Sequence, residues 1–175
     1  MGLLTISNEI MAEMEEGLSR EEIFQKHVES NPSGAAKYAY CIASIPASAL
    51  RKQYLISNGL LMVLLVLYAV ITVLAELPID LNEPTIFILI KTLLPLIFSY
   101  FVFRFHGGIY RLTGLWCSYD LLESILLSGV GTITDGIRLL ILFAIVFLAF
   151  TIARKVFPHL KVVGPKQDST GKFFL

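Results

Sequence analysis

The sequence has little charge, and the charge that it has is balanced. Only 16% of the 175 residues are Asp, Glu, Lys or Arg, against about 25% in an average soluble domain. Fourteen basic residues offset fourteen acidic ones, and a nucleic-acid binder needs an excess of Lys and Arg against phosphate. A disordered chain is also excluded, because 55% of the residues are hydrophobic.

Motifs for catalysis and cofactor binding are missing too. The three histidines, His27, His106 and His159, lack the His-Glu-x-x-His spacing of a zinc site. There is no Gly-x-Ser-x-Gly nucleophile turn and no phosphate-binding glycine loop. Cys41 and Cys117 are the two cysteines, and we expect neither to face an oxidising compartment or form a disulfide. The sequence therefore predicts no catalytic residue, no metal and no cofactor.

Long apolar runs are what the sequence does have. A bilayer core is about 30 Å thick, so a spanning helix needs roughly 20 apolar residues. Four runs predict spans at about 56–76, 84–104, 112–131 and 137–155. The third run contains Asp120 and Glu123, and its alternative is an amphipathic or re-entrant helix that does not cross. We therefore predict an all-α, polytopic integral membrane protein whose residues 54–156 form a bundle of four transmembrane helices.

The placement of charges predicts the orientation. Lys and Arg prefer the cytoplasmic ends of spans. The first loop, 76–83, holds three acidic residues and no Lys or Arg, whereas residues 154–175 carry five basic residues. We therefore expect a multi-pass protein of the cell membrane with both termini in the cytoplasm. Arg138 is the one dissenting charge, and Asp135, interpreted as a helix N-cap, partly offsets it.

Residues 1–53 predict a short cytosolic helical head. Ser7 or Asn8 suits the start of a first helix, and Ser19 with Glu22 forms a capping box that opens a second. A third helix, at about 34–45, ends before Pro46, and we interpret it as interfacial, lying along the inner leaflet or under the bundle. We expect the cytosolic tail, 157–175, to be a frayed end rather than a hairpin.

Three ionisable residues inside the predicted spans are the strongest candidate site. Asp120 and Glu123 share one helical face because they are three residues apart. Lys91 lies at a similar depth on the preceding, antiparallel span, so we expect a Lys91–Glu123 pair with Asp120 one turn further in. Such a group either fixes the helix register or forms a pathway for protons or cations.

A basic turn is the second candidate site. Arg104, His106 and Arg111 flank the cytoplasmic loop between the second and third spans, where anionic lipid headgroups would suit them. Membrane lipids and either a protein partner or a second copy of the chain are therefore the expected partners. We expect no nucleic-acid partner, because the second head helix carries Glu21, Glu22 and Glu29.

Two functions from different classes fit these features. The first is a non-catalytic adaptor, regulatory or inhibitory subunit that binds a protein partner at the membrane. The second is an oligomeric channel or transporter component that uses Lys91, Asp120 and Glu123. A lipid-acting enzyme ranks third, because the sequence lacks a nucleophile or metal-ligand set.

Overall fold

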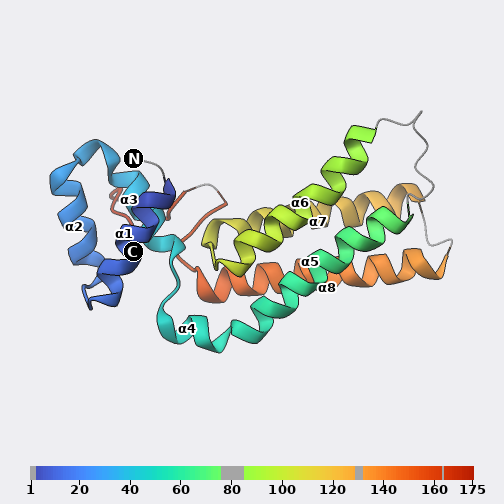
Figure 1. Cartoon of the computed structure of the whole chain (residues 1–175). Coiled ribbons are helices and arrows are strands. Elements are labelled where there is room, and N and C mark those ends of the chain that lie inside the picture. The colour runs from blue at the N-terminus through green and yellow to red at the C-terminus, as the bar shows by residue number, and fades with distance from the viewer. Residues whose placement is uncertain (1–2, 76–84, 129–131, 163) are drawn as a thin grey trace.

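The computed structural model describes residues 3–75, 85–128, 132–162 and 164–175, and within them the protein is all-helical. The head contains α1 (Leu3–Glu15), α2 (Arg20–Ser30), a short 3₁₀ turn (Pro32–Gly34) and α3 (Ala35–Ser44). A six-residue helix, α4 (Ser48–Gln53), leads into the long helices. These are α5 (Leu55–Ala75), α6 (Thr85–Phe103), α7 (Gly107–Glu123), continued by a π-helical turn (Ser124–Ser128), and α8 (Ile133–Val156). Figure 1 shows the head at one end of the elongated bundle.

Two of the four predicted spans are long and apolar enough to cross a membrane. They are α5, over Leu55–Leu74, and α8, over Ile133–Val156. In α6 the described apolar stretch is shorter, Ile90–Phe103, and α7 carries Asp120 and Glu123. α5 and α6 lie within one residue of the predicted boundaries, whereas α7 starts at Gly107 rather than at position 112 and α8 starts at Ile133 rather than at position 137. α7 ends at Glu123 and its π-helical continuation at Ser128, and the predicted end at position 131 lies outside the described residues.

The long helices share one core. Its fully buried members include residues of all four helices: Leu61, Leu65 and Tyr68 of α5, Val102 of α6, Tyr110 of α7, and Leu142, Ile145 and Ile152 of α8. Outward-facing side chains of the same helices are also apolar. Val63, Leu67 and Val70 on α5 and Leu140 and Phe143 on α8 are exposed, an unusual surface for a protein that meets only water.

Small residues let α7 approach its neighbours. A Cβ on Gly114 would stand 2.9 Å from the ring of Phe150 on α8, and one on Gly107 would stand 2.6 Å from the ring of Phe157. Glycine at these positions therefore permits contacts that a larger residue would block.

The head folds around its third helix. Ile42 of α3 is buried with Ile6 and Ile10 of α1 and Ile23 of α2. The capping box of Ser19 and Glu22 is confirmed at the start of α2. The predicted caps of α1 are wrong, because α1 begins at Leu3 and Ser7 and Asn8 lie inside it. The apolar side of α3 lies at the centre of the head core, and its Ala43 is buried in the core of the long helices.

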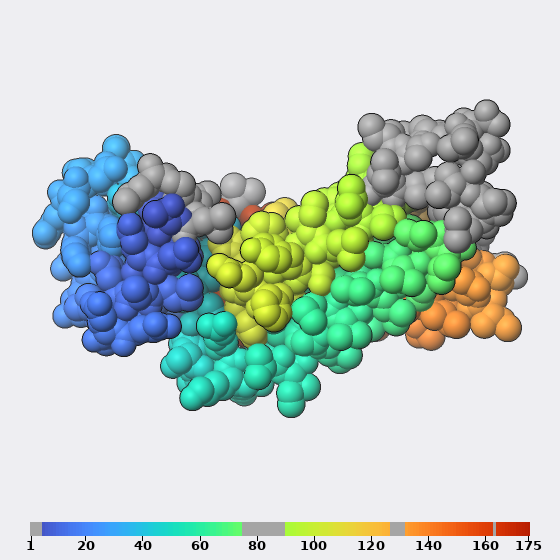
Figure 2. Space-filling view, viewed as in Figure 1, coloured from blue at the N-terminus to red at the C-terminus, as the bar shows by residue number. Residues whose placement is uncertain are grey.

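The tail is packed rather than frayed. Phe157 and Leu160 are buried against the bundle, and two isolated bridges, Leu160–Pro165 and Gln167–Phe173, fold the chain back. Leu175 packs on the head core. The space-filling view shows the head in close contact with the bundle (Figure 2). The prediction of a frayed end was wrong because short apolar segments gain order from a surface that the sequence does not reveal.

Candidate functional site

The predicted ion pair inside the bundle is present. Lys91 Nζ on α6 lies 3.1 Å from Glu123 Oε1 on α7 and 3.9 Å from Asp120 Oδ1. The Asp120 side chain is only 4% exposed, whereas those of Lys91 and Glu123 are about a third exposed, at 32% and 29%. Spacing on α7 therefore brings both carboxylates to Lys91, as the sequence predicted.

Two further residues complete this group, which we call the polar cluster (Tyr68, Lys91, Asp120, Glu123, Arg138). The Tyr68 hydroxyl on α5 donates a hydrogen bond to Asp120 Oδ2. Arg138 Nη2 on α8 lies 3.5 Å from the same carboxylate oxygen, and its guanidinium lies over the Tyr68 ring at 5.7 Å. The cluster thus joins α5, α6, α7 and α8.

The charges of the polar cluster balance. Two carboxylates, Asp120 and Glu123, face two cations, Lys91 and Arg138. In an apolar environment a lone charge is costly, and pairing reduces the cost. The arrangement can hold four helices in one register, because sliding any helix by one turn would separate a charge from its partner.

Sequence reasoning missed Arg138 and Tyr68. The signal for Arg138 was present, since Asp120 and Arg138 lie at similar sequence distances from the segment 129–131 that separates two helices predicted to be antiparallel. Arg138 was instead interpreted as offset by Asp135. In the structure Thr132 is the N-cap of α8, and Asp135 is its capping-box partner at the third helical position, N3. The interpretation of Asp135 as the N-cap was therefore wrong. Tyr68 gave no signal beyond an aromatic residue in an apolar run.

A second polar group lies nearer the head. The Tyr110 hydroxyl on α7 donates to Asn58 Oδ1 on α5 at 2.5 Å, and Asn58 Nδ2 donates to the Val102 carbonyl on α6 at 2.9 Å. Asn58 and Tyr110 are both buried. This chain satisfies two polar side chains inside the core and ties three helices together.

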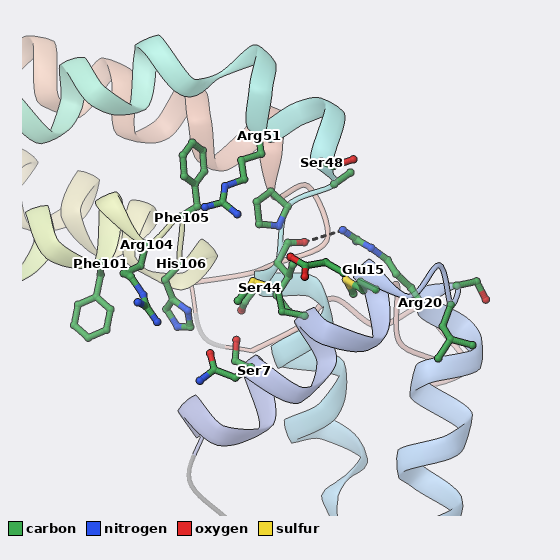
Figure 3. A pocket seen from close by; sticks show the side chains of 18 of the residues that line it. Ser7, Glu15, Arg20, Ser44, Ser48, Arg51, Phe101, Arg104, Phe105 and His106 are labelled. Carbon is green, nitrogen blue, oxygen red and sulfur yellow. Dashed lines mark hydrogen bonds between the residues drawn. The ribbon is translucent and has the colours of Figure 1, made fainter.

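The structure places the three residues of the predicted basic turn in two different surroundings. Arg104 and His106 line a cavity of about 620 Å³ between the head and the end of α6, and Arg111 is not part of its lining. Arg20 from α2 and Arg51 from α4 line the same cavity, as Figure 3 shows. No sequence pattern groups these arginines, because they come from separate segments.

The walls of this junction cavity are well defined. Arg20 Nη2 donates to the Ile45 carbonyl at 2.7 Å, and the Arg51 guanidinium lies 5.5 Å from the centre of the Phe105 ring. Phe105 is buried and has a φ of 54°, in the left-handed region, so tertiary packing holds this turn. Burial lowers the pKa of His106, which favours its neutral form in the cavity wall.

The remaining candidate residues are engaged or buried. Cys41 and Cys117 are free and buried, and burial raises the pKa of the Cys41 thiol, which keeps it protonated and weakly nucleophilic. His27 Nε2 lies 2.9 Å from Glu13 Oε2, and His159 stacks on Phe174. Among the described residues no three His, Cys, Asp or Glu side chains gather as metal ligands would.

The chain matches no protein-family model, and comparisons with curated proteins and with solved structures gave no significant match.

Proposed function

We propose that this chain is a four-span integral membrane protein of the cell membrane with both termini in the cytoplasm. Support comes from the apolar outward faces of α5 and α8. The charge-balanced polar cluster also supports it, because pairing lowers the cost of placing the charges of α6 and α7 in a bilayer. The last turns of α4 and α8 are basic, with Arg51 and Lys52 in α4 and Arg154 and Lys155 in α8. Both helix ends lie toward the head (Figure 1), as expected for a cytoplasmic rim.

We further propose that it acts as a non-catalytic adaptor or regulatory subunit. The head carries this proposal. It is a packed body of three helices and the tail, fixed to the bundle where the Tyr40 hydroxyl lies against Gly108. A shaped body held at the membrane surface can present a recognition surface to another protein. The polar cluster, in turn, is engaged in pairing its own helices, which favours this function over conduction through Asp120 and Glu123.

A cysteine-accessibility experiment tests the topology. Single cysteines replace Ser30, Asn82, Arg104, Thr134 or Ser169 in a variant in which Cys41 and Cys117 are replaced by serine and alanine. With four spans, an impermeant maleimide labels positions 82 and 134 in intact cells and the other three only after permeabilisation. If only α5 and α8 cross, position 104 is labelled from outside as well, and the four-span proposal fails.

Photo-crosslinking in native membranes tests the adaptor function. A photoreactive residue at exposed Gln25 on the head is compared with one at Phe143, which is exposed on α8. A partner that binds the head gives one discrete protein adduct from position 25 and none from position 143. Selective ion flux through vesicles containing the purified protein, abolished by Glu123→Gln, would instead support the channel.

A further inference from the structure

The junction cavity combines a positive wall with an apolar one. Three guanidinium groups line it, those of Arg20, Arg51 and Arg104, against one carboxylate among the described lining residues, that of Glu15. Met11 and Phe101 are among the apolar side chains of the same lining. Such a cavity is complementary to an anionic group attached to an apolar body, because arginine binds phosphate through paired N–H donors.

An exposed apolar stripe on α6 leads into this cavity. Leu93, Ile97, Tyr100 and Arg104 follow one another at spacings of four, three and four residues, so they share one helical face. Leu93, Ile97 and Tyr100 are exposed, and Tyr100 and Arg104 both line the cavity. One helix face therefore runs from an apolar surface to the cationic wall of the junction cavity. An acyl chain and its phosphate headgroup require this pattern.

We propose that the junction cavity binds the phosphate headgroup of an anionic membrane lipid, with an acyl chain along the α6 stripe. The site differs from the basic turn predicted from sequence, because it uses Arg20 and Arg51 and not Arg111. Arg20 belongs to the head and Arg104 to the turn that directly follows α6, so the bound lipid bridges the head and the bundle. The proposal rests on the membrane placement proposed above.

Native mass spectrometry of the full chain tests this site. The protein is released from nanodiscs that contain equal amounts of phosphatidylglycerol and phosphatidylcholine with the same acyl chains. The wild-type protein should retain phosphatidylglycerol in preference, and Arg51→Gln with Arg104→Gln should reduce that preference by about tenfold, because each lost charged contact weakens phosphate binding. Equal retention by the wild type and the double variant would overturn the proposal.

Matched variants and a soluble competitor sharpen the result. Arg111→Gln and Arg154→Gln remove charge from the same end of the bundle but not from the cavity lining, so both should retain the wild-type preference. Arg104→Gln alone removes one of the two charges. Because Arg104 is exposed, this single substitution should leave the fold intact. Glycerol phosphate that displaced the lipid completely would show a site for a soluble phosphate and overturn the lipid assignment.

Failure of this proposal is distinguishable from failure of the membrane placement. Extraction of membranes with alkaline carbonate should leave the wild type and every variant in the pellet. A protein that stays in the pellet but shows no lipid preference overturns the lipid site alone. A protein released by carbonate overturns the placement, and the lipid site with it.

Discussion

Tyr68 and Asp120 are 52 positions apart, yet the Tyr68 hydroxyl donates a hydrogen bond to the buried Asp120 carboxylate inside the bundle. The same carboxylate faces Arg138 on α8 and Lys91 on α6. Asp120 is therefore the one residue of the polar cluster that contacts all three neighbouring helices. Its removal should affect the bundle more than the removal of any other member.

Asp120→Asn should destabilise the bundle by about 3 kcal/mol, because it leaves the Arg138 charge without its carboxylate in an apolar environment. Glu123→Gln is the matched control on the same helix face, and its loss should be smaller because Glu123 is partly exposed and pairs with Lys91 alone. Unfolding of the purified protein in mixed micelles measures both. Equal losses would show that Asp120 does not organise the cluster.

The loss of stability caused by Arg138→Gln should depend on whether Asp120 is present. Arg138→Gln alone should destabilise the protein, whereas Arg138→Gln combined with Asp120→Asn should cost clearly less than the two single losses added together. The reason is that the double variant removes a pair and leaves no isolated charge between them. Additive losses, measured by the same unfolding experiment, would place the two residues in separate interactions.

The sequence sufficed for local elements because their signals are local. The capping box of Ser19 and Glu22 and the Lys91–Glu123 pair depend on helix periodicity and on antiparallel neighbours, both readable from spacing. Contacts between distant segments were not predictable in this way. The junction cavity brings Arg20 of α2, Arg51 of α4 and Arg104 after α6 together, and only the packing of the head on the bundle determines that.

The tail and the third head helix illustrate the same limit. Leu175 and Phe173 carry no signal that distinguishes an apolar end packed on a head from one that is frayed, yet Phe173 lies 6.0 Å from the ring of Phe24. Likewise the apolar side of α3 fits either a lipid surface or a protein core, and the packing of Ile42 against α1 and α2 decides it. Amphipathic periodicity gives a buried face but not what covers it.

Gly107→Ala should destabilise the junction of α7 with the tail by about 1–3 kcal/mol, because overpacking a filled site forces its neighbours apart. The added Cβ would stand 2.6 Å from the buried Phe157 ring and 2.7 Å from Leu160. Gly59→Ala in α5 is the matched control, since its Cβ would meet nothing within 4 Å, and alanine is the better helix former by about 0.5–1 kcal/mol. Equal changes in unfolding midpoint would contradict the packing argument.

Asn58→Leu should cost about 1–3 kcal/mol, although leucine is apolar and fits a membrane helix. It removes the close acceptor of the buried Tyr110 hydroxyl and leaves only the long contact to the Val102 carbonyl at 3.4 Å. Tyr110→Phe together with Asn58→Leu removes both partners and should recover part of the loss. Unfolding in micelles measures the three variants. A double variant no more stable than Asn58→Leu would show that the cost comes from packing rather than from the unpaired hydroxyl.

Acid should loosen the head through Glu13. Burial of Glu13 opposes its ionisation, but Lys26 at 2.7 Å and His27 at 2.9 Å outweigh it and hold the pKa below the ordinary value. The stabilisation is therefore present above the unfolded-state pKa of about 4.3 and is lost as the pH falls through the lower folded-state pKa. Hydrogen exchange of α1 and α2 in the full-length protein, corrected for intrinsic rates, should show this loss in the wild type and in Glu29→Gln. In Glu13→Gln, α1 and α2 should be less protected from exchange already at neutral pH, and their protection should change less as the pH falls. An unchanged pH dependence in that variant would exclude Glu13 as the titrating group.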